Sequence, residues 1–386
     1  MQKMLIHHFF KRVQSTSFEV TYWDGEHMKY GEGESSFTIK FHEKLTFSDL
    51  LKKPSLAFGE AYMDGKISID GDIESIVKVA YSNKTMLRSK KRYFLPRASS
   101  LNKQKKHVQH HYDLGNEFYS LWLDKTMSYS CAYFKKPDDS LEQAQLQKVD
   151  HVLKKLSLQP GDTLLDIGSG WGWLILQAAQ HYDVKATGIT ISKEQYKKTK
   201  ERISELGLQE RVEVELVDYR TFAESGRTFD KISSVGMFEH VGQRNYPHFM
   251  ASVDALLKDR GLALLHTITH PKEAPVDPWI DKYIFPGGYI PSLREILWLL
   301  PEYNFHVSDV EALRLHYAKT LDHWAGQFEQ NVHKVLEMYG ERFVRMWRFY
   351  LRSSAASFRI TGLNIHQIVF TKGLNNQLPM TREHLY

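Results

Sequence analysis

From about residue 107 onward, apolar and polar positions follow the pattern of alternating strands and helices. Short apolar runs of strand length are separated by segments in which apolar residues recur every three or four positions. This alternation predicts an α/β fold with a doubly wound, mostly parallel sheet. The predicted strands are 163–168, 184–190, 212–218, 229–236, 261–268 and 363–372, with helices beginning at Trp171 and Ser192 and two long helical segments covering roughly 317–357.

Residues 1–83 follow a different pattern, which predicts a smaller N-terminal α+β domain. Segments 18–25 and 36–42 alternate between apolar and polar residues as strands do, and they flank a turn that contains Gly31 and Gly33. The other segments have helical spacing. These are 47–53, 55–65 and 72–82, preceded by a short amphipathic helix within residues 1–13.

The apolar runs are too short for a membrane span or a signal peptide. No stretch reaches the roughly 18 consecutive apolar residues of a transmembrane helix. Basic residues and histidines interrupt the apolar residues of 1–13, whereas a signal peptide needs an unbroken run of about 7–15. We therefore expect a cytoplasmic protein that associates peripherally with the inner face of a membrane.

Positive charge is concentrated in the segment that separates the two patterns, 84–106. It contains nine of the 51 Lys and Arg residues and neither Asp nor Glu, so the rest of the chain has 42 basic and 46 acidic residues, a formal charge of −4. We interpret it as a basic linker between a lipid-binding-like domain, 1–83, and a catalytic domain, 107–386. The segment is either merely solvated or contacts an anionic membrane surface, where each basic residue contributes about 1 kcal/mol. Nucleic acid is the rival anion, but the sequence carries no recognition motif for it.

The amino-acid composition shows how large a core the chain can build and excludes several kinds of site. A chain of 386 residues that is 42% apolar can build a sizeable core in one large domain or two smaller ones. Its single cysteine, Cys131, excludes internal disulfides and a multi-cysteine zinc or iron–sulfur site. The Glu, His and Cys residues considered below also lack the local spacing of a metal site, so no metal is expected.

The sharpest local signal is segment 164–172, LLDIGSGWG. A buried strand ends in a glycine-rich turn and a helix follows at once, so a ligand can approach the backbone and a negative group is favoured at the helix N-terminus. Dinucleotide folds use G-x-G-x-x-G. The spacing D-x-G-x-G-x-G, with Asp166 on the strand and Asp218 after the third strand, instead resembles that of class I methyltransferases, which bind S-adenosylmethionine. The second strand ends at 188–192 without the acidic residue that many of those enzymes use for the ribose.

Five segments together resemble the cyclopropane-fatty-acyl-phospholipid synthases, a family whose core is shared with the mycolic acid cyclopropane synthases. The resemblance covers about 107–371, and the phospholipid branch has an additional N-terminal domain that 1–83 could supply. The five segments are HHYDLGNEFYSLWLDKTMSYSCAYF (110–134), LLDIGSGWGWL (164–174), GITISKEQ (188–195), VGMFEHVG (235–242) and HYAKTLDHW (316–324).

The resemblance implies a cofactor site for S-adenosylmethionine. Segment 129–130 closes over the cofactor, the glycine turn holds its methionine portion, and residues after the second strand replace the missing acidic residue at the ribose. Alternatives stay open, since Tyr129 could be a core residue and Gln195 an exposed helix residue. The implied cofactor residues are Tyr129, Ser130, Gly168, Gly170, Trp171, Gly172, Thr190, Ile191, Gln195, Asp218, Tyr219 and Val235.

The resemblance also implies the reaction and its base. An alkene has no acidic proton, so the enzyme positions the methyl group against it and keeps water away from the carbocation that forms. A bound bicarbonate then takes a proton from the new methyl group and the ring closes. Its holders map onto Cys131, Glu239, His266, Ile268 and Tyr317, with the amides of Cys131 and Ile268 as donors and Glu239 accepting from the bicarbonate OH.

Other interpretations of these residues and of the whole chain stay open. A lone cysteine is usually a small buried apolar residue, and a histidine on an apolar strand usually belongs to the core. The implied activity is transfer of a methylene to a cis double bond of an unsaturated phospholipid in a membrane, by a protein that the family suggests is a homodimer. The alternatives are a methyl-branching fatty-acyl methyltransferase and a non-catalytic lipid-binding protein.

Overall fold

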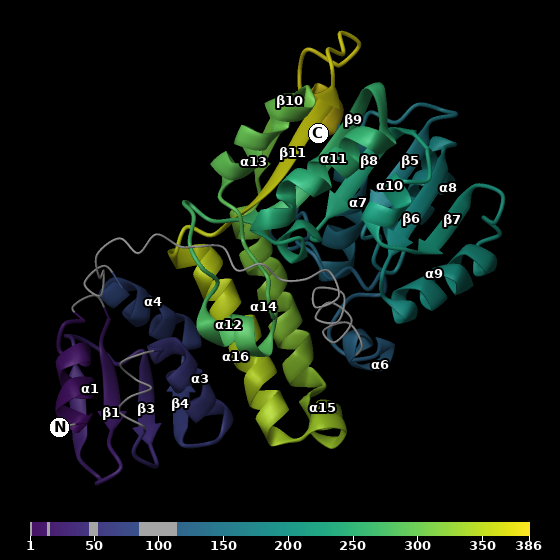
Figure 1. The fold of residues 1–386 in the computed structure, drawn as a ribbon. Helices are drawn as coiled ribbons and strands as arrows, with labels where there is room; N and C mark the ends of the chain where they lie inside the picture. The colour runs from purple at the N-terminus through teal and green to yellow at the C-terminus, as the bar shows by residue number, and fades with distance from the viewer. Residues whose placement is uncertain (1, 14–15, 46–52, 85–113) are drawn as a thin grey trace. The chain divides into compact units, whose positions relative to one another are not determined.

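The computed structural model describes residues 2–13, 16–45, 53–84 and 114–386 (Figure 1). The basic linker and nearly all of the predicted helix 47–53 lie outside the described residues. Contacts divide the chain into two compact units, of which unit 1 comprises 1–95, 276–286 and 321–363, and unit 2 comprises 96–275, 287–320 and 364–386. Unit 1 thus includes two segments that the sequence analysis assigned to the catalytic domain. The sequential boundaries 1–83, 84–106 and 107–386 stay a prediction.

Unit 2 is built on a seven-stranded sheet of order β10-β11-β9-β8-β5-β6-β7. Neighbouring strands in the series β9-β8-β5-β6-β7 pair in parallel, whereas β11 is antiparallel to both β9 and β10. The predicted mostly parallel sheet is therefore confirmed. The strands are β5 (Thr163–Ile167), β6 (Lys185–Thr190), β7 (Val212–Leu216), β8 (Phe229–Val235), β9 (Leu257–Thr269), β10 (Phe305–Ala312) and β11 (Asn364–Lys372).

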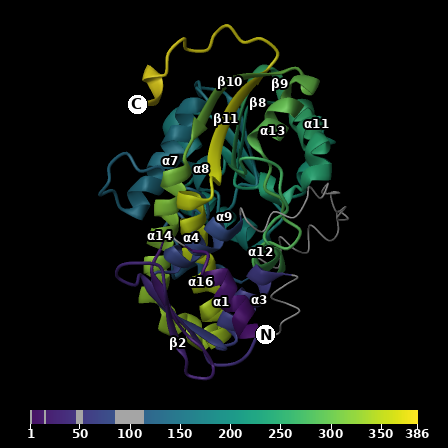
Figure 2. The same ribbon diagram turned by 90° about the vertical axis from the view of Figure 1, so that its left-hand side faces the viewer.

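Helices cover both faces of this sheet (Figure 2). Successive residues of β5 point to opposite faces, so Leu164 packs in one apolar cluster and Leu165 in another. The first cluster includes residues of α7, α8 and α9, and the second includes residues of α10, α11 and α13. The helices of unit 2 are α6 (Asn116–Ser120), α7 (Leu141–Lys155), α8 (Trp173–Tyr182), α9 (Lys193–Glu205), α10 (Tyr219–Ala223), α11 (Tyr246–Leu256) and α13 (Leu293–Leu299).

Three features of this part of the chain differ from the prediction. Helix α8 begins at Trp173, because Gly172 adopts a left-handed conformation and Trp171 lies in the turn before it. Edge strand β10 was not predicted, since most of its residues are exposed or half-buried and it has little apolar pattern. The helical segment 317–357 consists of α14 (Arg314–Gln330), α15 (Val332–Tyr339) and α16 (Glu341–Ile360), with the division between the units falling inside α14.

Unit 1 contains a four-stranded sheet of order β2-β1-β3-β4, formed by β1 (Phe18–Thr21), β2 (His27–Tyr30), β3 (Phe37–Phe41) and β4 (Ile67–Gly71). The two predicted strands, β1 and β3, pair in parallel, and β2 and β4 were not predicted. Besides α15, α16 and part of α14, the helices of this unit among the described residues are α1 (Gln2–Phe10), α3 (Pro54–Met63), α4 (Ile73–Lys84) and α12 (Pro278–Tyr283). In the part of the chain that the structure describes, no helix is both long enough and apolar enough to cross a membrane.

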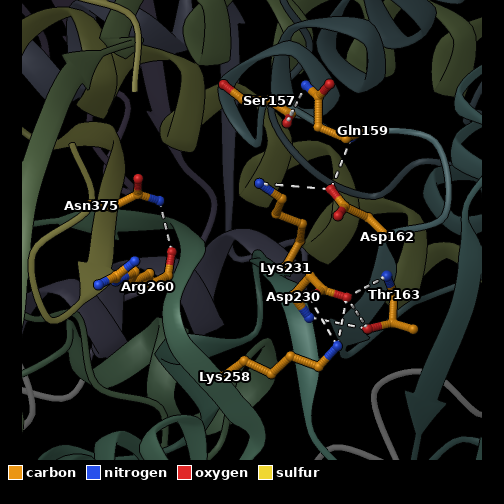
Figure 3. A network of polar contacts seen from close by, with 9 residues as sticks. All are labelled: Ser157, Gln159, Asp162, Thr163, Asp230, Lys231, Lys258, Arg260 and Asn375. Atoms are coloured by element: carbon orange, nitrogen blue, oxygen red, sulfur yellow. Dashed lines mark hydrogen bonds and ion pairs between the residues drawn. The ribbon is translucent and has the colours of Figure 1, made fainter. Parts of the chain in front are cut away.

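A polar network connects the amino ends of the central strands of unit 2 (Figure 3). The Asp230 carboxylate accepts hydrogen bonds from the Thr163 amide (2.9 Å), the Thr163 hydroxyl (2.6 Å) and Lys258 Nζ (2.9 Å). Lys231 lies 3.8 Å from Asp162. These polar residues connect β5, β8 and β9 at the amino ends of the strands. Sheets of this kind bind ligands at the opposite edge, where the carboxyl ends lie. We assign these polar residues a structural role.

Candidate active site

A cavity in unit 2 lies at the carboxyl ends of β5, β6 and β8 and beside the turn that follows β7. Its wall contains every predicted cofactor residue except Gly172. Segments far apart in the sequence therefore meet at the place where the topology of a doubly wound sheet puts a ligand. The predicted residues in the wall are Tyr129, Ser130, Gly168, Gly170, Trp171, Thr190, Ile191, Gln195, Asp218, Tyr219 and Val235.

The turn after β5 needs glycine at two positions, because of the backbone conformation and because neighbouring side chains pack closely there. Gly168 has φ +82°, and a Cβ there would lie 2.8 Å from Met237 Cγ. Gly172 has φ +83° and lies at the N-terminus of α8, where a Cβ would lie 2.4 Å from Thr199 Cγ2 of α9. Gly172 thus allows α8 and α9 to approach each other, and it is not among the residues that line the cavity.

Polar residues after β6 form a connected group in the wall. Thr190 Oγ1 donates to Gln195 Oε1 over 2.8 Å, and the Ser192 amide donates to Thr190 Oγ1 over 3.2 Å. All three are buried and line the cavity. They lie at the end of β6 and just after it, where the acidic residue of many class I methyltransferases is missing from this chain.

Two aromatic residues of the wall offer polar atoms to a ligand. The Tyr219 hydroxyl and Trp173 Nε1 are buried and have no hydrogen-bond partner among the described residues. Burial raises the pKa of Tyr219 to about 12, so its hydroxyl stays protonated. Asp218 instead holds Arg220 through two bonds of 2.7 and 2.6 Å, which fixes the start of α10. Unpaired polar groups in a buried wall fit a polar cofactor such as S-adenosylmethionine.

The sequence analysis missed three residues that hold the wall in place. Gln145 Nε2 donates to the carbonyls of Ser128 (3.2 Å) and Ser130 (2.9 Å), and Lys148 Nζ donates to Ser130 Oγ (2.9 Å). Arg202 is buried and donates to the carbonyls of residues 125, 126 and 171. For Gln145 and Lys148 a signal existed, since both lie on the apolar stripe of α7, where a buried polar residue needs partners.

The predicted bicarbonate residues are not among the residues that line the cavity. Glu239, in the 3-10 helix η1 (Phe238–His240), accepts a hydrogen bond from the Ile268 amide through Oε1 over 2.6 Å. Its Oε2 is buried without a partner among the described residues. Burial raises the pKa of Glu239. The Ile268 amide was predicted to donate to bicarbonate, whereas in the structure it orients Glu239.

His266 lies on β9, two residues before Ile268. Burial lowers its pKa to about 3, with Lys148 as a further cause, so the imidazole is neutral. Gln367 Nε2 donates to Nδ1 over 3.2 Å, which leaves the proton on Nε2, and this atom is buried without a partner among the described residues. One free acceptor, Glu239 Oε2, and one free donor, His266 Nε2, fit a group that both donates and accepts hydrogen bonds.

The segment that follows Ser130 is attached to the first turns of α14. The Ala132 amide donates to Thr320 Oγ1 and the Phe134 amide to His316 Nδ1, each over 3.0 Å. These bonds place Cys131 beside the helix that carries the buried Tyr317. Burial raises the pKa of the Cys131 thiol, so the side chain is not a thiolate at neutral pH.

The sheet order, the glycine turn after its first parallel strand and the cavity at the carboxyl edge define a class I S-adenosylmethionine-dependent methyltransferase. A family model described as mycolic acid cyclopropane synthetase matches residues 99–368. The chain belongs to this cyclopropane synthase family of methyltransferases. A second model, for a domain of unknown function, matches residues 5–92.

Comparison with individual proteins and with a solved structure also supports membership of the cyclopropane synthase family. The chain is 40% identical over 375 residues to a probable fatty acid methyltransferase of Pseudomonas putida, which covers 94% of this chain and 95% of that protein. It is 40% identical over 359 residues to the cyclopropane-fatty-acyl-phospholipid synthase of Escherichia coli K12, covering 91% and 92%. The crystal structure of mycolic acid cyclopropane synthase CmaA1 complexed with SAH and CTAB is 36% identical, with a TM-score of 0.65 over 69% of this chain and 98% of that one.

Proposed function

We propose that this protein is a cyclopropane-fatty-acyl-phospholipid synthase, which uses S-adenosylmethionine to convert a cis double bond of an unsaturated phospholipid acyl chain into a cyclopropane ring. The observation that carries the proposal is the length of the similarity. The Escherichia coli relative matches 91% of this chain, whereas the mycobacterial cyclopropane synthase structure covers 69%. The match thus extends beyond the methyltransferase core, which supports the phospholipid enzyme over the mycolic acid enzyme as the guide to this chain's substrate.

The residues of this chain position the reactants and keep water away from them. When bound, S-adenosylmethionine supplies an electrophilic methyl group. The alkene attacks the methyl carbon, the carbon–sulfur bond breaks, and a cation remains on the acyl chain. Loss of one proton from the new methyl group then closes the ring, so one proton and S-adenosylhomocysteine are released. Because water would trap the cation as an alcohol, the burial of His266 and of Glu239 Oε2 favours ring formation.

We further propose that Glu239, His266, Tyr317 and the Cys131 amide hold a bicarbonate ion, which supplies the base for this proton. Glu239 Oε2 accepts from its OH, and the neutral His266 donates from Nε2. Both atoms are buried and unpaired among the described residues, which supports this assignment. In this scheme the Ile268 amide orients Glu239 rather than the bicarbonate.

A second candidate is a methyl-branching enzyme on the same scaffold. The name of the Pseudomonas putida relative, a probable fatty acid methyltransferase, favours it. The two candidates differ in product mass, since ring formation adds one CH2 to the acyl chain and methylation followed by reduction adds CH2 and two hydrogens. A product of only the heavier mass would contradict ring formation.

The deciding experiment is turnover on vesicles of unsaturated phospholipid with S-adenosylmethionine, bicarbonate and a hydride donor, which the methyl-branching route needs for its reduction, read by lipid mass spectrometry. We expect a product that is heavier by one CH2. Glu239→Gln removes the carboxylate, and we expect turnover to fall at least about 100-fold while the dissociation constant for S-adenosylmethionine stays within about twofold. Glu302→Gln makes the same chemical change on an exposed residue and serves as the control. Wild-type turnover by Glu239→Gln would contradict its role.

A lipid substrate also implies contact with a membrane surface. We propose that the protein acts at the inner face of the membrane, through an anionic surface, and as a homodimer. The basic segment 84–106 supports the first part of this proposal. Size-exclusion chromatography with light scattering tests the dimer, and a monomer at micromolar concentration would contradict it.

A further inference from the structure

Lys148 is a buried cation in the wall of the cofactor cavity, and its bond to Ser130 accounts for only one of its three donors. It lies on the buried face of α7, and 4% of its surface is exposed. Its ammonium has three N–H donors, and Ser130 Oγ, 2.9 Å away, is its one acceptor in the described parts of the chain. Lys155 of the same helix is equally buried, but it has two carboxylate partners, Glu311 at 2.6 Å and Asp309 at 3.3 Å.

The need to hold the Ser130 segment in place does not explain why a lysine is buried at this position. Gln145, one turn earlier on α7, already holds the carbonyls of Ser128 and Ser130. Removing an ammonium from water without a counter-charge is costly, and burial lowers the pKa of Lys148. The acidic groups that face it, Asp124 and Asp166, act at longer range and form no ion pair with it in the described residues. A bound anion would satisfy the two remaining donors.

The place of Lys148 in the cavity indicates which anion this is. It lines the cavity with Ser130, its hydrogen-bond partner, and with Asp166, whose charge acts on it. Asp166 precedes Gly168 of the glycine turn by two residues, so we place Lys148 at the glycine-turn end of the cavity. This is the end expected for the methionine portion of S-adenosylmethionine, which carries a carboxylate. The ribose and adenine are expected at the opposite end, near Thr190 and Tyr219.

We propose that Lys148 binds the carboxylate of the amino-acid portion of S-adenosylmethionine through Nζ, with Ser130 Oγ orienting the ammonium. The proposal rests on the cofactor placement given above. It makes Lys148 a specificity residue, which distinguishes the intact cofactor from nucleosides that lack the carboxylate.

The test compares two ligands that differ only in this carboxylate, S-adenosylmethionine and decarboxylated S-adenosylmethionine. Dissociation constants are measured by calorimetry without lipid, so that no turnover occurs. We expect the wild type to prefer the intact cofactor. We expect Lys148→Met to reduce that preference about tenfold or more, mainly through weaker binding of S-adenosylmethionine. The ratio of the two constants is independent of the folded fraction, so partial unfolding of the variant does not imitate the effect.

Lys155→Met is the matched control, since it removes a buried lysine of the same helix that does not line the cavity. We expect it to lower stability and to leave the ligand preference unchanged. Equal weakening of both ligands by Lys148→Met would show a structural role and overturn the inference. An unchanged preference would overturn it as well. If the wild type binds neither ligand, the proposed cofactor site itself is wrong.

Discussion

At the scale of single residues, burial decides which groups of the site carry charge. Asp166 is buried at the end of β5 and accepts a hydrogen bond from Ser233 Oγ over 2.7 Å. Burial raises the pKa of Asp166 to about 6, although Ser233 and Lys148 favour the charged form. Asp166 lines the cavity, and we predict that it binds the positively charged amino group of S-adenosylmethionine, which only the ionised carboxylate attracts.

We therefore expect S-adenosylmethionine to bind more weakly as the pH falls through about 6. Protonation of Asp166 removes the attraction, and Asp166→Asn should bind weakly at every pH. His240 and His266, whose pKa values burial lowers to about 4 and about 3, do not titrate above pH 5. Calorimetry between pH 5 and 7 measures the effect. A flat profile in the wild type would contradict the role of Asp166.

The same raised pKa has a consequence for stability, with a definite sign. An aspartate has a pKa of about 3.9 when unfolded, so ionisation favours the unfolded state once the pH exceeds that value. The destabilisation grows until the pH reaches about 6, where Asp166 is half ionised in the fold, and is then constant. We expect Asp166→Asn to be more stable than the wild type at pH 7 and to lose this advantage below pH 4, as measured by urea unfolding.

The residues of the site differ in how well the sequence predicted them. The glycine turn and the group Thr190–Gln195 could be found, because local motifs place them at the ends of consecutive strands. Arg202 could not, because its partners lie up to 77 positions away. For Lys148 the helical pattern indicates burial, but it does not identify the partner Ser130, which lies 18 positions away. The bond from the Ile268 amide to Glu239 was missed for the same reason, since β8 and β9 bring the two together only in the fold.

At the scale of elements, a buried ionic group attaches the unpredicted strand β10 to α7. Glu311 of β10 lies 2.7 Å from His151 Nε2 and 2.6 Å from Lys155 Nζ. Burial alone would raise the pKa of Glu311, but these two hydrogen bonds more than offset it and hold the pKa at about 2. The sequence gives little indication of this edge strand, because its attachment depends on charges from a helix more than 150 positions earlier.

Glu311→Gln should destabilise the protein by about 2 kcal/mol, because it removes the nearer of the two carboxylates that pair with the buried Lys155 and leaves only Asp309, at 3.3 Å. Since the pKa of Glu311 is depressed, its contribution is present at neutral pH and is lost as the pH falls from about 4 towards 2. Arg294→Gln breaks an exposed pair with Glu273 and is the control, with an expected loss below about 1 kcal/mol. Urea unfolding measures both variants, and equal losses would contradict the assignment.

At the scale of the whole molecule, sequence and structure agree on the α/β core and differ in how the chain is divided. The core was predictable because strand and helix periods alternate regularly from β5 to β9. The composition of unit 1 was not, because 276–286 and 321–363 group with 1–95 through contacts between distant segments. Charge is divided unevenly as well, since the positive balance of the chain comes from 84–106 alone.

This concentration of charge leads to a prediction for membrane binding. Neutralising Lys90, Lys91 and Arg92 should weaken binding to anionic phospholipid vesicles by up to about 100-fold at low salt, since each basic residue near such a surface contributes about 1 kcal/mol. The difference should shrink as salt screens the charges. Cosedimentation with anionic and with neutral vesicles, at two salt concentrations, measures both effects.

A matched variant separates the position of the charges from their number. Lys193, Lys197 and Lys200 are exposed on α9, so neutralising them changes the net charge by the same amount at another place. If 84–106 contacts the membrane, the α9 variant should bind anionic vesicles nearly as the wild type does. Equal losses in both variants would show a nonspecific effect of net charge. Unchanged binding by the Lys90, Lys91 and Arg92 variant would mean that the segment is only a solvated linker, and membrane contact would then have to come from another part of the chain.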